Sequence, residues 1–163
     1  MERRLIVMRH AKSAAGGLGT SDHERILTDR GQREATEIAE RLVELGWTPH
    51  LVVSSDAMRT RQTWEAMEPH FDPVPEVRWD PELSLAGVDA VQRSLVQLDD
   101  DITDVLVLGH NPGWQAVISY FAGRQERLTT ANAALLHATS DSWRQAAQPG
   151  ALELIQVLRP RKI

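Results

Sequence analysis

Residues 3–17 read RRLIVMRHAKSAAGG, and this stretch decides the fold. It contains a continuous apolar run over residues 5–8, which is the pattern of a strand covered on both faces in an α/β sheet. The run ends directly at Arg9 and His10. The question that this stretch raises is what a cation and an imidazole do at the end of a buried strand.

Apolar runs alternate with amphipathic segments along the rest of the chain. The segment that begins at Thr28 has apolar residues at helical spacing, with Thr28 or Asp29 as a cap and Gly46 as a terminator. Further helices are expected over residues 57–67, 88–98 and 114–122, and strands over residues 5–8, 51–53, 76–79, 105–108, 133–138 and 151–158. This alternation predicts βαβ units, and therefore a single-domain, three-layer α/β/α protein with a mostly parallel central sheet.

Composition excludes several classes of protein. The 163 residues, 42% of them hydrophobic, fit one compact domain with a sizeable core. A net charge of -5 disfavours a non-specific nucleic-acid binder, and the lack of cysteine excludes disulfides, thiolate catalysis and cysteine-based zinc sites. No apolar run approaches the ~18 residues of a membrane span, and the short run near the start is followed by charges, unlike a signal peptide. We therefore expect a cytoplasmic protein with neither a nucleic acid nor a membrane as partner.

Ligands of such sheets bind beyond the carboxyl ends of the strands, so the residues that follow each strand are candidates for a site. These residues are Arg9 and His10 after the first strand, Ser54, Ser55 and Arg59 after the second, and Gly109, His110 and Asn111 after the strand at 105–108. Two guanidinium groups match the geometry of phosphate oxygens, and a histidine can act as a nucleophile or as a donor in the same pocket. The pattern predicts phosphoryl chemistry.

Four motifs resemble, in the same order, those of the histidine phosphatase superfamily, whose fold is phosphoglycerate mutase-like. They are LIVMRHAKS at 5–13, LTDRGQREA at 27–35, SSDAMRTRQT at 54–63 and LVLGHNPG at 106–113. The short chain and the forms RHAKS, DHERILTDRG and GHNPG are most similar to the SixA-type phosphohistidine phosphatases. The resemblance extends from about residue 4 to residue 158, and it implies one histidine phosphatase domain over residues 1–163.

The resemblance implies a role for each matching residue. His10 is the expected nucleophile, because a neutral imidazole can attack phosphorus near neutral pH when its other nitrogen is held as a donor. The residues expected to bind the phosphoryl oxygens are Arg9, Arg59 and His110. The residues expected to border the pocket are Lys12, Ser13 and Asn111. The implied activity is that of a metal-independent phosphatase that forms a covalent phosphohistidine.

The sequence departs from the wider superfamily in several places. Many members have Arg-His-Gly-Glu followed by an asparagine, whereas this chain has Ala11, Lys12 and Gly16, which argues against a phosphoglycerate mutase. Glu82 lies roughly where many members carry a proton donor, so it is a candidate general acid; a capping or surface role is the alternative. Asp56 replaces a proline and is interpreted as a turn variation without chemical consequence.

The expected reaction is hydrolysis of phosphohistidine in a phosphoprotein, with inorganic phosphate as product. The alternatives are a broad phosphomonoesterase acting on small phosphorylated substrates and a non-catalytic module that binds phosphorylated ligands. Neither a metal nor an organic cofactor is expected, because the chain has no His-Glu-x-x-His spacing and GHNPG matches neither the dinucleotide fingerprint nor the phosphate loop. The remaining histidines, His23, His50, His70 and His137, are expected on the surface or in loops.

Overall fold

A six-stranded sheet forms the centre of the protein. The computed structural model describes residues 1–15, 19, 21–84 and 87–161. The strands are β1 (Glu2–Arg9), β2 (Leu51–Ser54), β3 (Glu76–Trp79), β4 (Asp104–Gly109), β5 (Ala133–Thr139) and β6 (Glu153–Leu158). Their order in the sheet is β3-β2-β4-β1-β5-β6. The first four strands in this order, β3, β2, β4 and β1, pair in parallel with their neighbours, whereas β5 is antiparallel to both β1 and β6. The prediction of a mostly parallel sheet is therefore confirmed.

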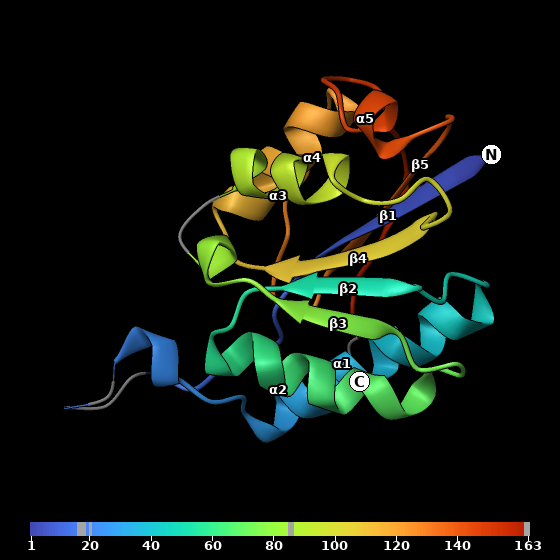
Figure 1. Cartoon of the computed structure of the whole chain (residues 1–163). Coiled ribbons are helices and arrows are strands. Elements are labelled where there is room, and N and C mark those ends of the chain that lie inside the picture. Colours follow the sequence, from blue (N-terminus) through green and yellow to red (C-terminus); the bar gives the residue numbers. More distant parts are fainter. Residues whose placement is uncertain (16–18, 20, 85–86, 162–163) are drawn as a thin grey trace.

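Helices cover both faces of this sheet, as Figure 1 shows, with α1 and α2 on one face and α3, α4 and α5 on the other. The helices are α1 (Asp29–Glu44), α2 (Met58–Met67), α3 (Val88–Val96), α4 (Gly113–Ala122) and α5 (Trp143–Ala146). Short 3-10 segments occur at η1 (Asp22–Glu24), η2 (Glu68–His70) and η3 (Pro81–Ser84). The three-layer α/β/α prediction is confirmed. In the described part of the chain, none of the helices combines the length and the apolar character needed to cross a membrane.

The strand predicted at residues 5–8 is buried on both faces, which explains its continuous apolar sequence. Leu5 and Val7 belong to the core cluster that contains the apolar residues of α3 and α4. Ile6 and Met8 point to the other face and pack in the cluster formed with α1 and α2. Each of the four side chains is at most 2% exposed. Burial of each side chain contributes roughly 1.5–3 kcal/mol of transfer free energy, so this strand anchors both layers.

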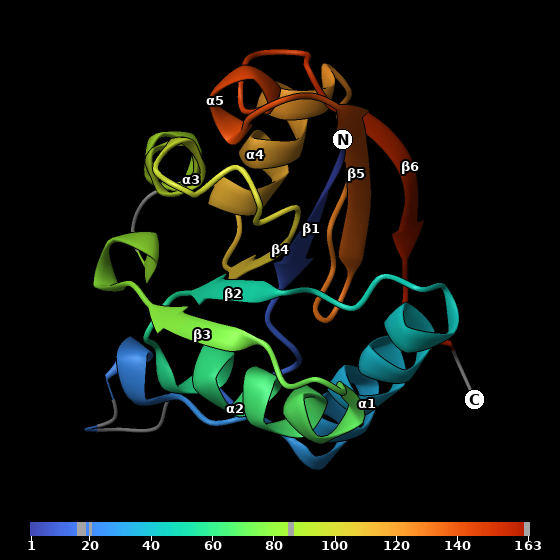
Figure 2. The same cartoon turned by 45° about the vertical axis from the view of Figure 1, so that its right-hand side comes forward.

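The sheet order places the carboxyl ends of β2, β4 and β1 side by side. Arg9 of β1 is paired with Gly109 of β4, and Ser54 of β2 is paired with Leu108 of β4. Figure 2 shows that β5 and β6 lie together on the side of the sheet away from β3. Because β4 lies between β2 and β1, segments that are far apart in sequence meet at this one edge, the usual position of ligand sites in such folds.

The ends of α1 agree with the sequence signals. The hydroxyl of Thr28 caps the helix by accepting a hydrogen bond from the backbone N–H of Gly31. Gly46 follows the helix with a φ of +76°, a left-handed conformation that glycine adopts without steric cost. Other boundaries differ slightly from expectation: α3 ends at Val96 and β6 begins at Glu153. Helix α5 was not predicted, because four residues are too few to show a helical period.

Candidate active site

His10 lies just beyond the end of β1 with its ring nearly buried, 6% of the residue being exposed. Its Nδ1 is 2.7 Å from the carbonyl oxygen of Ala11, so Nδ1 carries the proton and donates it to this acceptor. Burial lowers the pKa of His10 to about 4, because the hydrogen bond to Ala11 offsets only part of that effect. The charges that lower the pKa further are those of Arg59, Arg9 and Arg25. Near neutral pH His10 is therefore a neutral imidazole with its lone pair on Nε2.

The backbone around His10 is fixed on three sides. The N–H of His10 donates to the carbonyl of Gly109 at 3.0 Å, and the carbonyl of His10 accepts from the N–H of Ala131 at 3.0 Å. The next N–H, that of Ala11, donates to the hydroxyl of Thr63 on α2 at 3.0 Å. Strand β4, the segment before β5 and helix α2 thus all hold the residue in place, which restricts the orientation of the imidazole.

Two glycines allow neighbouring segments to approach this edge closely. A Cβ at Gly109 would overlap the indole ring of Trp114, which lies at the start of α4. A Cβ at Gly31 would overlap the backbone carbonyl of Lys12, in the loop that follows His10. Both glycines belong to sequence motifs identified above, and in both cases the structure requires the absence of a side chain rather than an unusual backbone conformation.

Arg9 and Arg59 bring two guanidinium groups close to His10. The Nη1 of Arg9 donates to the carbonyl of Leu128 at 3.1 Å. Arg59, on the first turn of α2, is 8% exposed. The pKa of Arg9 is lowered by burial and then by the charge of Arg59. Two like charges that are partly removed from water repel each other, and an anionic group bound between them would relieve that repulsion.

Arg25 is a third cation at this edge, and it was not among the site residues predicted from the sequence. Its guanidinium donates to the hydroxyl of Ser13 at 2.9 Å and to the carbonyl of Ala14 at 3.0 Å, and its charge lowers the pKa of His10. Arg25 lies in a loop without periodicity, so the available signal was its place inside the quoted segment DHERILTDRG. Ser13 is buried against this arginine, whereas Lys12 is exposed.

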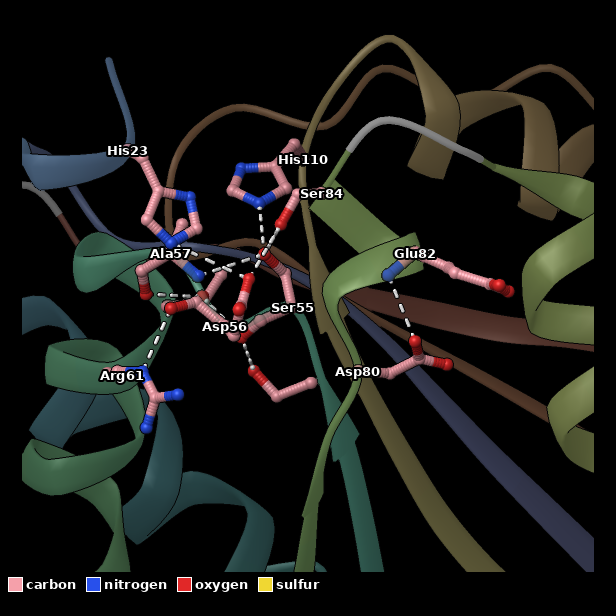
Figure 3. Close-up of polar contacts among 11 residues, drawn as sticks. His23, Ser55, Asp56, Ala57, Arg61, Asp80, Glu82, Ser84 and His110 are labelled. Carbon is pink, nitrogen blue, oxygen red and sulfur yellow. Dashed lines mark hydrogen bonds and ion pairs between the residues drawn. The ribbon is translucent and has the colours of Figure 1, made fainter. Parts of the chain in front are cut away.

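His110 follows β4 directly and faces His10. The centroids of the two rings are 5.3 Å apart, and the ring planes are tilted by 54°. The Nε2 of His110 is 2.7 Å from the hydroxyl oxygen of Ser55, at the end of β2 (Figure 3). The structure thus brings together the two histidines and two arginines that the sequence predicted at one edge of the sheet.

Asn111 lies next to this cluster, but its side-chain amide is engaged within the protein. Its Nδ2 donates to the side chain of Gln115 at 3.0 Å and to the carbonyl of Leu128 at 2.8 Å. The same carbonyl accepts from Arg9. Asn111 therefore holds the segment that positions Arg9, whereas its expected contact with substrate stays a prediction.

Glu82 is not brought to the histidines. Its carboxylate forms an ion pair with Nη1 of Arg93 at 2.5 Å, and its side chain is 66% exposed. Figure 3 shows the carboxylate turned away from His110. Of the two roles considered from the sequence, this geometry favours a surface residue over a general acid.

The other histidines lie outside this cluster. His23, His50 and His70 are exposed, and His137 on β5 lies between Glu2 and Glu153. Across residues 1–15, 19, 21–84 and 87–161, no three His, Cys, Asp or Glu side chains are grouped so that they could hold a metal ion.

Comparison with known proteins agrees with the resemblance that the four sequence motifs indicated. Residues 5–85 match the model of the histidine phosphatase superfamily (branch 1). An uncharacterized chloroplastic protein of Arabidopsis thaliana is 37% identical over 98% of this chain and 79% of its own length.

Solved structures are similar over almost the whole chain. A protein of Nakamurella multipartitia that is assigned as phosphohistidine phosphatase SixA is 32% identical, with a TM-score of 0.80 over 98% of this chain and 97% of its own. A protein of Agrobacterium tumefaciens with the same assignment is 27% identical, with a TM-score of 0.82 over 97% of this chain and 98% of its own. The tungstate complex of the protein histidine phosphatase SixA shares the fold at 24% identity, with a TM-score of 0.82 over 96% of this chain and 97% of its own.

Proposed function

Because this chain belongs to the histidine phosphatase superfamily, we propose that it hydrolyses phosphohistidine in a phosphoprotein through a covalent intermediate on His10. The observation that carries the proposal is the state of His10: a neutral imidazole whose Nδ1 is held by Ala11 and whose Nε2 retains its lone pair. Two of the similar proteins are assigned as phosphohistidine phosphatases, which supports this class of substrate.

In the first step, Nε2 of His10 attacks the phosphorus atom of the substrate. A new N–P bond forms on His10 while the N–P bond of the substrate breaks, and the departing imidazole takes a proton from water. In the second step, water attacks the phosphorus on His10, the N–P bond of the enzyme breaks, and inorganic phosphate leaves. His10 returns to its neutral form and is ready for another cycle.

Arg9, Arg59 and His110 bind the phosphoryl oxygens in this proposal. The charge on these oxygens and the in-line arrangement of the attacking and leaving nitrogens must both be stabilised during transfer. Hydrogen-bond donors that are already oriented before the reaction stabilise the charge of the transition state effectively. The mutual repulsion of Arg9 and Arg59 in the free protein supports this assignment, since a phosphoryl group would reduce it. Arg25 adds positive charge near His10. Residues proposed to border the pocket are Lys12, Ser13 and Asn111.

A phosphohistidine substrate also suits the position of Glu82. Imidazole departs from phosphorus more readily than an alkoxide does, so its departure needs less help from a general acid. The carboxylate of Glu82 is paired with Arg93 and turned away from His110. We therefore propose that transfer from phosphohistidine proceeds without a proton from Glu82.

A substrate panel tests the proposal. Release of phosphate is measured from a histidine-phosphorylated protein, para-nitrophenyl phosphate, sugar phosphates and a phosphoserine peptide, with His10→Ala as the matched inactive variant. We expect the highest kcat/KM on the phosphohistidine protein and no turnover by the variant. An alkaline quench, which preserves the acid-labile N–P bond, should trap the transferred phosphoryl group on the parent protein and not on His10→Ala.

Other outcomes select the alternatives. Comparable kcat/KM values on the phosphate esters and on the phosphohistidine protein would indicate a broad phosphomonoesterase. Binding of the phosphorylated protein without release of phosphate would indicate a non-catalytic binding module.

A further inference from the structure

A chain of hydrogen bonds connects His110 to a carboxylate outside the cluster of histidines and arginines. Nε2 of His110 lies 2.7 Å from the hydroxyl oxygen of Ser55, which lies 2.8 Å from the hydroxyl oxygen of Ser84. The hydroxyl of Ser84 donates to Oδ1 of Asp56 at 3.1 Å. Figure 3 shows the four side chains in this sequence, with Ser84 reaching from η3 to the loop that follows β2.

The number of protons on each group determines which group is the donor in each hydrogen bond of this series. A carboxylate only accepts hydrogen bonds, so the single hydroxyl proton of Ser84 points to Asp56. The oxygen of Ser84 then accepts the hydroxyl proton of Ser55. The oxygen of Ser55 also accepts from the backbone N–H of Ala57 at 3.2 Å. With its own proton already used, Ser55 presents an acceptor to His110, and Nε2 of His110 must be the donor.

We infer that Asp56 is a positioning residue for the proposed phosphatase reaction, acting through Ser84 and Ser55 to keep a proton on Nε2 of His110 and to fix its ring beside His10. The inference rests on the proposed function only in giving His110 a phosphoryl oxygen to bind. When that oxygen arrives, a second proton on Nδ1 makes His110 a cationic donor, and the carboxylate at the far end of the chain balances the charge. A charge-assisted donor is roughly twice as strong as a neutral one.

The role inferred for Asp56 contrasts with the turn variation without chemical consequence that was predicted from the sequence. The residue does lie in a turn, between β2 and α2, but its carboxylate connects two segments that are distant in the chain. The side chain of Asp56 is 23% exposed, and the exposed His23 lies 3.6 Å from the same oxygen. Arg61 donates to the backbone carbonyl of Asp56 and helps to hold the turn.

The test observes His110 directly by nitrogen NMR on protein labelled with ¹⁵N-histidine, with the His110 signals assigned from a His110→Gln sample. In the free parent protein we expect a proton on Nε2. With saturating inorganic phosphate, the product, we expect protons on both ring nitrogens. Asp56→Ala and Ser84→Ala should each free the proton of Ser55 to point toward His110, so that the ring populates the tautomer protonated on Nδ1.

The same variants are compared for phosphate affinity and kcat. We expect each to lose about 10-fold, a typical effect of removing a partner that orients a site residue. The double variant should lose no more than either single variant, because both substitutions break one chain. Ser94→Ala, which removes a half-buried hydroxyl bonded within α3, is the control and should match the parent.

The outcomes separate this inference from the proposed function. The NMR measurement and phosphate binding need no turnover. A shift of the His110 tautomer in both Asp56→Ala and Ser84→Ala therefore supports the positioning role of Asp56 even if the parent protein does not hydrolyse phosphohistidine. Asp56→Leu, whose branched side chain has a similar length and cannot accept the proton of Ser84, provides a second variant if Asp56→Ala unfolds. The inference is overturned if His110 keeps its parent tautomer and phosphate affinity in both Ser84→Ala and a folded Asp56 variant.

Discussion

The imidazole rings of His10 and His110 face each other with their centroids 5.3 Å apart because β1 and β4 are adjacent parallel strands that end in register. Their nitrogens are held differently. His10 is bonded through Nδ1 to the backbone of Ala11, whereas His110 is bonded through Nε2 to the side chain of Ser55. The ring of His10 is thus held with its proton on Nδ1 and its lone pair on Nε2, and the ring of His110 is the proposed donor at the end of a polar chain.

His10→Ala should abolish phosphate release and preserve the fold. The substitution removes the Nε2 that is proposed to attack from a loop position and leaves the apolar run of β1 unchanged. Circular dichroism and the thermal unfolding midpoint check the fold, and the alkaline quench checks for a phosphoenzyme. Measurable turnover in a folded His10→Ala sample would assign the nucleophile to another residue.

Stability should depend on pH through His10 with a defined sign. The folded pKa of about 4 lies below the ordinary value of 6.5, so between these values the unfolded chain binds a proton that the folded protein does not. The free energy of unfolding therefore falls as pH falls through this window, by up to about 3 kcal/mol from this residue. Relative to the parent, His10→Ala should become more stable as pH is lowered from 6.5 to 4.

Urea unfolding at several pH values measures this effect. His70→Ala, which removes an exposed histidine, is the control and should follow the parent curve. If the difference between His10→Ala and the parent does not change with pH, then the pKa of His10 is not depressed in the folded protein.

Arg9→Lys and Arg59→Lys should each lower kcat/KM by roughly 10-fold or more, because a point charge cannot reproduce the planar fork of a guanidinium on phosphoryl oxygens. The control is Arg78→Lys, which changes an exposed arginine paired with Glu76 on β3. Steady-state kinetics on the phosphohistidine protein provide the measurement. Parent-like kinetics in both Arg9→Lys and Arg59→Lys would indicate that the phosphoryl group binds elsewhere.

Glu82→Gln should change the hydrolysis of phosphohistidine by less than about twofold, as expected for a surface substitution away from the reacting atoms. Arg93→Gln breaks the same ion pair from its other side and should behave alike. Both variants are assayed on the phosphohistidine protein and on para-nitrophenyl phosphate. A loss of about 10²–10⁴-fold confined to Glu82→Gln and to the ester would instead identify Glu82 as a general acid for oxygen leaving groups.

Removal of divalent metal ions should leave the activity unchanged, since the proposed route relies on arginines and histidines for charge stabilisation. The measurement is kcat/KM after dialysis against a chelator, with a known magnesium-dependent phosphatase treated in parallel. A loss of activity that is reversed by adding a divalent cation would contradict the proposed mechanism.

The sequence by itself determined the layered α/β fold and the residues at the ends of the strands. The apolar run at residues 5–8 predicts a doubly covered strand, and helical spacing after Thr28 predicts α1, because each pattern reflects burial of one local segment. The same local reasoning placed His10 and His110 directly after strands, whereas Arg9, also predicted to follow the first strand, is the last residue of β1. Four ordered motifs then indicated the superfamily.

Only the tertiary structure decided which side chains meet and how each one is held there. Insertion of β4 between β2 and β1 brings Ser55 to His110, and η3 brings Ser84 to the carboxylate of Asp56. Arg25 joins the cluster of histidines and arginines from an aperiodic loop. Such contacts depend on strand order and loop paths, which no local period encodes, and the depressed pKa of His10 depends on the burial and charge that those paths create.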